Sequence, residues 1–499
     1  MRGHTFYAPF LRVGGDFIMN NMGKMNIHLF RTCGNSYIYD VCNNVVLKVD
    51  DNIYTQLLHM QSSEKLELSK AVDVNPVIYK LWNEGFLRTD IIKKIKHPMT
   101  DNVADALNND LHMLILQVTQ NCNLRCKYCI YSGSYINRRH NNKRMDFSIA
   151  KKAIDYYIRH SSQLQKLRFG FYGGEPTLES SLIKKCVKYI TDQAIGREIE
   201  FNLTTNATML NREWIDFFSH YGFYLTISLD GPEKIQDRNR VFAGSGEGTF
   251  AIVKKNIEII IREYPAYMKY VHFNAVMDPS DKYFQLSDFF SNNPLVKDFY
   301  AVATEQNDVN YESSICHSED YDVELAYDRF KKIYCTLRNI DICNQPLVDG
   351  YLVSIKKNIA DELKRDISGL REAHPGGPCV PGLQRLFVDV DGNMYPCERI
   401  NETASIMRIG NVYDGIDFDR AKELLNVAKI SEEQCKACWA FRFCTSCAVY
   451  AEDGDSLSKR KRLHRCKTIQ ANAEYYLKEY CALKNMKFDF SLLESQCEV

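Results

Sequence analysis

Apolar stretches of strand length alternate with stretches of helical periodicity along the middle of the chain, from residue 111 onward. The intervening segments, such as SIAKKAIDYYIRH, repeat apolar residues every three or four positions, as one face of a helix does. Strands and helices that alternate in this way predict parallel βα units, and six in series predict a partial (β/α)6 barrel. The predicted strands lie in HMLILQVT, KLRFGFYGGEP, EFNLTTNAT, YLTISLDG, YVHFNAVMD and KDFYAVATE.

The N-terminal part of the chain shows a different pattern. Residues 27–50 are dense in aromatic and β-branched residues, which predicts two or three short strands. Helical spacing follows in NIYTQLLHM and in NPVIYKLWNEGFL, and the second helix is expected to end near Gly85. A few strands followed by two or three helices predict a small winged-helix-like module.

The chain beyond the barrel changes pattern twice more. Residues 320–370 are helical in pattern and rich in lysine, and from HPGGPC onward cysteines are frequent while regular periodicity is scarce. We therefore expect an α/β protein of four segments. They are a winged-helix-like module at residues 1–105, a partial barrel at 106–320, a helical bridge at 321–374 and a cysteine-rich domain at 375–499.

The composition limits the kinds of partner that the protein is expected to bind. The 499 residues carry 63 Lys plus Arg against 63 Asp plus Glu, so no global field attracts nucleic acid or an anionic membrane. The longest apolar runs are too short to cross a bilayer, and the first residues lack the apolar core of a secretion signal. We expect a cytoplasmic protein that binds neither nucleic acid nor membrane.

Eighteen cysteines are many for a cytoplasmic protein, and ten of them lie in two groups with short spacings. Short spacings indicate metal ligands, whereas evenly spread cysteines in a small secreted chain indicate disulfides. For the scattered remainder we expect small buried hydrophobic side chains. These are Cys33, Cys42, Cys186, Cys316, Cys335, Cys343, Cys481 and Cys497.

The first group follows the first predicted barrel strand and consists of Cys122, Cys126 and Cys129. Thiolates are soft ligands that suit zinc and iron–sulfur clusters. Three cysteines leave one iron of a [4Fe–4S] cubane free to bind a substrate or cofactor. The alternative is a zinc knuckle completed by a distant ligand such as His140.

This group and three later motifs resemble the signature of radical S-adenosylmethionine (SAM) enzymes. The motifs are Cys-x3-Cys-x2-Cys with Tyr128 before the third cysteine, YGGEP (172–176) with Gly173, Gly174 and Glu175, TTNAT, and SLDG beginning at Ser228. Arg240 lies where related maturases have an arginine for the SAM carboxylate. The resemblance implies a [4Fe–4S] cluster on the three cysteines with SAM on its open iron. It also implies an external electron donor of the flavodoxin or ferredoxin type.

The second group resembles the SPASM extension of peptide-modifying radical SAM enzymes, on the motifs Cys379, Gly392 in GNMYPC, and CKACWAFRFCTSC. One departure is that Cys444 and Cys447 are separated by two residues instead of three. The resemblance implies two auxiliary [4Fe–4S] clusters. One would be held by Cys435, Cys438, Cys444 and Cys466, and the other by Cys379, Cys397 and Cys447.

Two questions stay open in this second group. The fourth ligand of the three-cysteine set is either Cys316 or Cys343, or that iron is open to a substrate thiolate. One or two structural zinc ions are the alternative to clusters. Glu398 follows Cys397, where sulfatase-maturing relatives carry an aspartate base, although an ion-paired glutamate is the simpler interpretation.

The N-terminal module resembles the precursor-recognition domain of ribosomal peptide maturases, which binds a leader peptide as an added strand; a structural cap on the barrel is the alternative. The combined resemblance implies a maturase that forms thioether crosslinks in a ribosomally made, cysteine-rich precursor peptide. Carbon–carbon crosslinking and formylglycine formation are alternatives of the same enzyme class. A zinc-stapled DNA-binding regulator is a non-enzymatic alternative. The sequence assigns no catalytic residue.

Overall fold

A computed structural model of the chain describes residues 25–62, 75–88, 92–131, 135, 138–306, 316, 318–340, 345–365 and 370–496. The chain divides into two compact units. The first comprises residues 1–91 and 367–369, and the second comprises residues 92–366 and 370–499. The four-segment division expected from the sequence stays a prediction.

The first unit contains a three-stranded antiparallel sheet in the order β1-β2-β3 and two helices. The strands are β1 (Ile27–Thr32), β2 (Asn35–Asp40) and β3 (Val45–Val49), and the helices are α1 (Asp51–Ser62) and α2 (Pro76–Asn83). Ile38, Leu57 and Ile78 form its buried core. The predicted strands and helices are confirmed, and β1 and β3 form the two edges of the sheet.

The centre of the second unit is a sheet that contains the six predicted barrel strands, all parallel. They lie in the order β12-β11-β9-β8-β7-β5, so strands that follow one another in this series are also neighbours in the sheet. The strands are β5 (Met113–Thr119), β7 (Lys166–Gly173), β8 (Glu198–Thr205), β9 (Tyr224–Ser228), β11 (Val271–Met277) and β12 (Tyr300–Glu305). Parallel strands place their carboxyl ends at one edge, where this fold class carries its chemistry.

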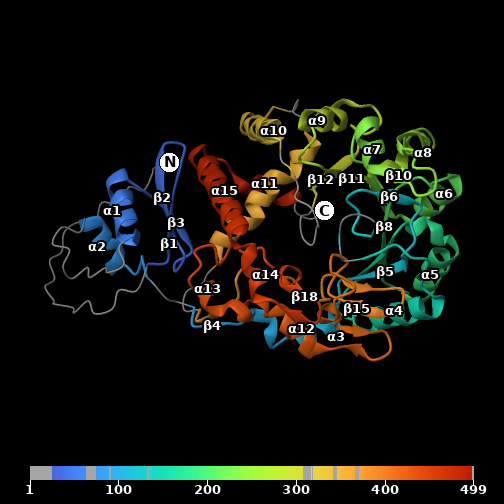
Figure 1. Ribbon diagram of the computed structural model, residues 1–499, viewed down its shortest axis with the longest axis horizontal. Helices are drawn as coiled ribbons and strands as arrows, with labels where there is room; N and C mark the ends of the chain where they lie inside the picture. Colours follow the sequence, from blue (N-terminus) through green and yellow to red (C-terminus); the bar gives the residue numbers. More distant parts are fainter. Residues whose placement is uncertain are drawn as a thin grey trace. The chain divides into compact units, whose positions relative to one another are not determined.

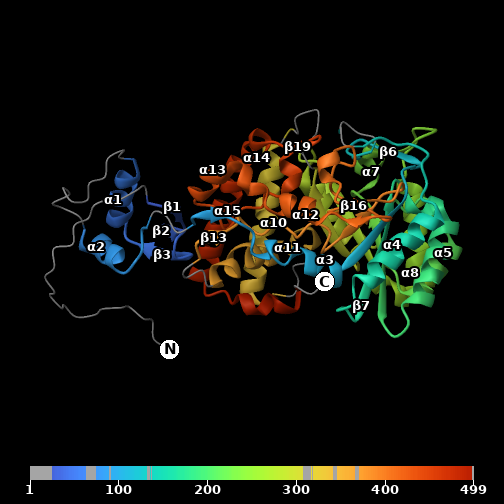
Figure 2. The ribbon, with the colours of Figure 1, turned by 90° about the horizontal axis from the view of Figure 1, so that it is seen from below.

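Helices connect these strands and cover the outer side of the sheet (Figures 1 and 2). Their apolar faces explain the packing: on α4, Ala150, Ile154 and Tyr157 are buried against the strands. The helix α6 begins where Asn211 accepts a hydrogen bond from Trp214 N (2.9 Å) and ends at Gly222 in the left-handed region. The connecting helices are α4 (Phe147–Arg159), α5 (Ser180–Gln193), α6 (Arg212–Tyr221), α7 (Glu233–Asn239), α8 (Phe250–Glu263) and α9 (Tyr283–Asn292).

The C-terminal region extends the same sheet, which the sequence pattern did not predict. Strand β14 pairs in parallel with β5, and three further antiparallel strands complete a ten-stranded sheet. These strands were not predicted because two or three residues are too few to show an alternation of apolar and polar positions. These strands are β14 (Leu386–Val388), β15 (Asn393–Tyr395), β16 (Gly410–Asn411) and β17 (Gly415–Ile416).

The helical pattern of residues 320–370 corresponds to α10 (Glu319–Arg338) and to α11 (Asp349–Ile355), which continues into a π-helical turn at Lys356–Ala360. The role of this segment as a bridge stays a prediction. Tyr321, Leu325 and Leu352 of the bridge share a buried cluster with Leu483 of the last helix. None of the described helices is both long enough and apolar enough to cross a membrane. The remaining elements are α3 (Val103–Asn109), α12 (Phe418–Leu425), α13 (Glu432–Lys436), α14 (Lys459–His464), α15 (Cys466–Asn485), β4 (Lys94–Ile95), β6 (Leu124–Cys126), β10 (Arg240–Phe242), β13 (Glu372–Ala373), β18 (Glu452–Asp453) and β19 (Ser456–Leu457).

Candidate metal centre

The loop after β5 brings Cys122, Cys126 and Cys129 together. Burial raises the pKa of Cys122 to about 12, with further contributions from the charge of Glu175 and from the other two cysteines. Backbone N–H groups already point at two of the sulfurs, Leu124 N at Cys122 Sγ (3.3 Å) and Tyr131 N at Cys129 Sγ (3.4 Å). The loop is thus a half-buried all-sulfur donor set with hydrogen-bond support, rather than a group of unrelated thiols.

The glycine pair of YGGEP contacts this loop directly. Gly174 N donates to Thr119 O (3.0 Å), and Glu175 N donates to Asn121 O (2.9 Å). A Cβ on Gly173 would lie 2.1 Å from Thr119 O, and a Cβ on Gly174 would lie 2.1 Å from Asn121 O. The glycines are therefore required by the packing of two backbones, the end of β7 and the cysteine loop.

Glu175 joins the ends of three strands. Its buried carboxylate accepts hydrogen bonds from the N–H and hydroxyl of Thr177, from the hydroxyl of Thr205 (2.7 Å) and from Asn206 N (2.8 Å). Burial raises its pKa, and these donors oppose that effect. The Asn206 amide in turn donates to Asn123 Oδ1 (2.9 Å) in the cysteine loop. The geometry gives Glu175 a positioning role, and its predicted contact with a cofactor stays a prediction.

Arg240 lies beside the second cysteine and is paired with an aspartate. It faces Cys126 across the β6–β10 pair, and its guanidinium donates twice to Asp230, from Nε to Oδ2 and from Nη2 to Oδ1, both at 3.0 Å. The Tyr128 hydroxyl donates to the same carboxylate. Burial raises the pKa of Cys126 to about 12 against the opposing charge of Arg240.

Asp230 is not among the site residues predicted from the sequence, although it is the third residue of SLDG. It is fully buried and orients both Tyr128 and Arg240. Ser228, two residues earlier, ends β9 and is half-buried at the same edge of the sheet. The proposed alternative zinc ligand, His140, instead lies against the ring of Tyr131 with its Nδ1 3.4 Å from Gln120 O.

In the C-terminal region, Cys435, Cys438, Cys444 and Cys466 line one cavity of about 300 Å³. Burial raises the pKa of Cys444 to about 11, and Cys438 and Cys435 add to that effect. Gln470 Nε2 donates to Cys438 Sγ (3.4 Å), and the hydroxyl of Ser431 lies 3.3 Å from Cys435 Sγ. The four cysteines assigned to one auxiliary cluster by resemblance thus surround one space.

Cys379, Cys397 and Cys447 form a separate set. Burial raises the pKa of Cys397 to about 11, with contributions from Glu398 and Cys447, and the pKa of Cys447 is raised by burial and by Cys379. The turn before Cys379 is held close to the other set, since Gly376 adopts φ +63° and its Cβ would lie 1.8 Å from Cys444 O. Cys316 is exposed, and Cys343 lies outside the described residues.

Comparison with known proteins identifies the central region: residues 116–283 match the radical SAM superfamily. The protein is a radical SAM enzyme. Enzymes of this superfamily use a [4Fe–4S] cluster and SAM. The match therefore argues against the alternative of a zinc-stapled DNA-binding regulator.

Several curated proteins are similar to this radical SAM enzyme. It is 29% identical over 302 residues to a cysteine-type anaerobic sulfatase-maturating enzyme of Clostridium novyi, covering 58% of this chain and 73% of that protein. It is 25% identical over 397 residues to the corresponding enzyme of Clostridium perfringens, covering 73% of this chain and 96% of that protein. An uncharacterized protein of Methanocaldococcus jannaschii is 38% identical over 141 residues, which cover 28% of this chain and 46% of that protein.

Among solved structures, the fold is similar to native anSMEcpe with bound AdoMet. The TM-score is 0.56 at 21% identity, and the match covers 75% of this chain and 98% of that one. At this identity the likeness concerns the fold, and it supports the arrangement of strands and helices described above.

The residues of this radical SAM enzyme fit the clusters that its family uses. Thiols become thiolates when a metal replaces their protons, and sulfur is the donor that iron–sulfur clusters take. No three His, Cys, Asp or Glu side chains in the described ranges converge on a single point as ligands of one ion would. The ligands of a cubane attach to separate irons and need no such point. Assignment of individual cysteines to each cluster stays a prediction.

A buried cation lies between the two C-terminal cysteine sets. Arg462 is 2% exposed and donates to the hydroxyls of Ser431 (3.1 Å) and Ser446 (3.0 Å). Its charge lowers the pKa of Cys444 in one set and of Cys447 in the other, opposing the larger effect of burial. Among the described carboxylates none forms an ion pair with it. A metal–thiolate group held by either cysteine set would supply a counter-charge to this cation.

Gly174→Ala is expected to dislodge the cysteine loop, because its Cβ would overlap the backbone of Asn121. Iron content after anaerobic reconstitution should fall from about twelve to about eight per chain, the value for two cubanes. Gly244→Ala is the matched control, since a Cβ there meets nothing within 4 Å. Full iron content in the Gly174 variant would contradict this account of the glycine pair.

Arg462→Gln is expected to lower the reduction potential of an auxiliary cluster, because the cation stabilises the more negative, reduced state. The shift should be some tens of millivolts, since about 59 mV corresponds to a factor of ten for one electron. The measurement is a redox titration followed by electron paramagnetic resonance. Arg460→Gln, an exposed residue of the same helix, is the control and should leave the potential unchanged.

Proposed function

We propose that this enzyme forms thioether crosslinks in a ribosomally made, cysteine-rich precursor peptide. Each crosslink removes a hydrogen atom, a proton and an electron from the peptide. When bound, the SAM cluster would supply the radical that takes the hydrogen atom, and the auxiliary clusters would take the electron. An external flavodoxin- or ferredoxin-type donor in the cytoplasm would deliver the electron that starts each turnover.

A peptide substrate is supported by two observations. A solved structure similar in fold at 21% identity and TM-score 0.55 is described as anSMEcpe with bound AdoMet and Kp18Cys peptide. In this chain, the first unit offers a small antiparallel sheet with edges at β1 and β3, the kind of edge to which a leader peptide adds as a strand.

The observation that carries the thioether proposal is the separate set of three thiols. Cys379, Cys397 and Cys447 lie together, and Cys379 is exposed. A cubane on three protein thiolates retains an open iron, which suits the thiolate of a substrate cysteine. Resemblance to the SPASM pattern supports this assignment.

Glu398 is the carboxylate that would accept the thiol proton in this proposal. Its Oε1 pairs with Arg385, so the simpler expectation of an ion-paired glutamate holds for that oxygen. Its Oε2 is buried and accepts no hydrogen bond from the described residues. An unfilled acceptor beside Cys397 is a suitable proton acceptor for a substrate group that enters there.

Formylglycine formation is the second candidate, favoured by the similarity to cysteine-type sulfatase-maturating enzymes. It needs the same radical and a proton acceptor, but it converts a cysteine side chain into an aldehyde without joining two residues. Carbon–carbon crosslinking differs again, since it leaves the cysteine thiols free.

The test is anaerobic reconstitution with iron and sulfide, followed by SAM, reductant and a synthetic cysteine-rich peptide. Cys126→Ala should reduce 5′-deoxyadenosine formation at least about 100-fold, because one ligand of the SAM cluster is lost. Cys33→Ala, an exposed cysteine of the first unit, is the control.

Product chemistry then separates the candidates. A thioether removes two hydrogens from the peptide mass and consumes a free thiol. A carbon–carbon bond removes the same mass but keeps the thiol, and formylglycine reacts with a hydrazide. An aldehyde product would replace the thioether proposal with the second candidate, and undiminished SAM cleavage by Cys126→Ala would refute both.

A further inference from the structure

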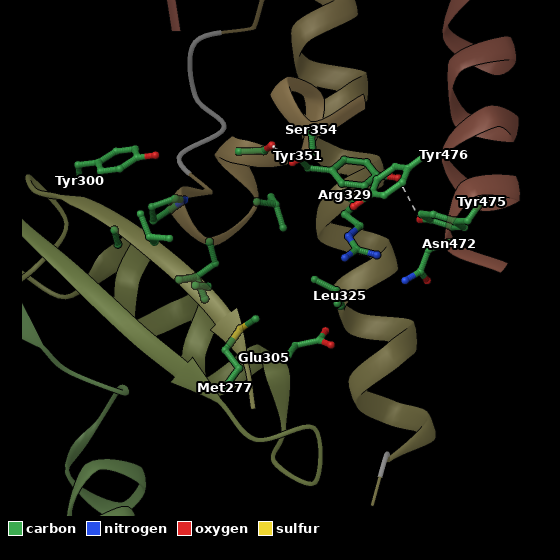
Figure 3. A pocket seen from close by; sticks show the side chains of 17 residues that line it. Met277, Tyr300, Glu305, Leu325, Arg329, Tyr351, Ser354, Asn472, Tyr475 and Tyr476 are labelled. Carbon is green, nitrogen blue, oxygen red and sulfur yellow. Dashed lines mark hydrogen bonds between the residues drawn. The ribbon is translucent and has the colours of Figure 1, made fainter. Parts of the chain in front are cut away.

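A cavity of about 480 Å³ lies away from the cysteine sets, along the outer edge of the barrel sheet (Figure 3). Its walls come from β12, from the bridge helices α10 and α11, and from α15. This volume is within the range of ligand sites in proteins. Neither the sequence motifs nor the proposed chemistry accounts for it.

One wall of the cavity is the last strand of the barrel series, and the turn Pro346–Val348 lies beside part of that strand. Strand β12 is the last strand of the sheet and pairs only with β11 among the described strands. Tyr300 and Val302 on this strand keep 47% and 41% of their surface exposed. An unpaired edge of this kind offers main-chain donors and acceptors to an added strand.

The opposite wall carries a cation that faces the cavity. The guanidinium of Arg329 on α10 lies over the rings of Tyr351 (4.8 Å) and Tyr475 (5.9 Å), whose hydroxyls bond each other (3.0 Å). Figure 3 shows Arg329 across the cavity from Tyr300. Arg329 forms no ion pair with any described carboxylate, although Glu479 is near enough for the arginine to lower its pKa against the larger effect of burial.

The guanidinium and aromatic rings of this wall suit a carboxylate ligand. A planar guanidinium held between aromatic rings keeps a fork of N–H donors fixed, which matches the two oxygens of a carboxylate. Partial burial strengthens that attraction relative to a surface pair. Tyrosine rings beside it add apolar surface for the stem of an acidic side chain.

One end of the cavity lies at the carboxyl ends of the barrel strands, where the predicted cluster cysteines also lie. Met277 and Glu305, the last residues of β11 and β12, both line it. The cysteine loop follows the end of β5 in the same parallel sheet, so one end of the cavity lies at the sheet edge that carries the predicted SAM-cluster cysteines. A chain lying along β12 is thereby directed toward that edge.

We propose that the groove along β12 binds the peptide substrate as an added, extended strand and holds one acidic side chain of that peptide against Arg329. The inference rests on the proposed peptide substrate and adds a recognition element to it. The preferred segment is an extended stretch with a Glu or Asp among β-branched residues.

The test uses the full-length reconstituted enzyme and fluorescein-labelled eight-residue peptides made of Thr and Val with one central Glu. Fluorescence anisotropy should show that replacing Glu by Gln in the probe weakens binding about tenfold. Arg329→Gln should weaken binding of the Glu probe by about the same factor. The two changes together should weaken it no further, because they remove one shared contact. Arg338→Gln, an exposed arginine of the same helix, is the matched control and should bind as the wild type does.

A second set of probes tests whether the peptide pairs with β12 as a strand, without any change to the protein. Probes that carry N-methyl groups on alternate amides should bind about tenfold more weakly, since they cannot pair with β12. Equal binding of the Glu and Gln probes, or no binding of any Glu probe, would overturn the inference. Competition by glutarate with no effect of N-methylation would show a pocket for small carboxylates and would overturn it as well.

The outcome is separable from that of the proposed function. If Arg329→Gln leaves probe binding unchanged while the enzyme still crosslinks a cysteine-rich peptide, the groove assignment fails and the function stands. If the acidic probe binds as expected but no peptide is modified, the proposed reaction fails and the binding site stands.

Discussion

The contact between the glycine pair at the end of β7 and the cysteine loop after β5 fixes the geometry of the predicted SAM site. Two backbones meet there with no room for a Cβ at Gly173 or Gly174. Hydrogen bonds from Gly174 and Glu175 to the loop follow from that approach, and the Glu175 carboxylate then extends the support to Asn206 at the end of β8. The loop is therefore positioned by contacts with neighbouring strand ends, and such contacts reduce the conformational entropy that a bound group would otherwise have to offset.

The C-terminal region is joined to this site through a second buried interaction. Arg138 is 3% exposed, pairs with Glu402, and donates to the carbonyls of Glu398 (through Nη2) and Ile400 (2.9 Å). Removing both charges from water is costly, so such a pair contributes little net stability, but breaking it by loss of one partner costs several kcal/mol. Its effect is positional: it holds the segment after Cys397 against the loop that follows the SAM cysteines. Together with β14 on β5, it makes the two cysteine regions one structural unit.

The sequence was most informative where periodicity and spacing act over long stretches. Six strands in order and the helices between them follow from apolar patterns, and the two C-terminal cysteine sets brought together are those expected from the SPASM resemblance. It failed where the decisive interaction is a single contact between distant residues. In the sequence, nothing distinguishes Asp230 from the other carboxylates. Only the fold shows that Asp230 is fully buried and paired with Arg240. Arg462 likewise lies in KRKRLH, a run that resembles a solvated surface, yet it is the buried member.

The first and last strands of the six-strand barrel series differ in a way that suits a peptide-modifying enzyme. The outer side of β5 is paired with β14 at Leu114–Leu116, so the C-terminal region covers the middle of that strand. At the other edge β12 has no described strand partner, and the bridge helices stand far enough off to leave a cavity with a cation on its wall. An unprotected sheet edge favours aggregation and is usually blocked by charge, proline or a covering element. An edge at β12 without a described strand partner, next to a cavity, suits the proposed peptide strand, which would pair with β12 and then dissociate. Under the proposed function, β14 on β5 holds the C-terminal cysteine region in place, and the edge at β12 would receive a peptide that leaves after each turnover.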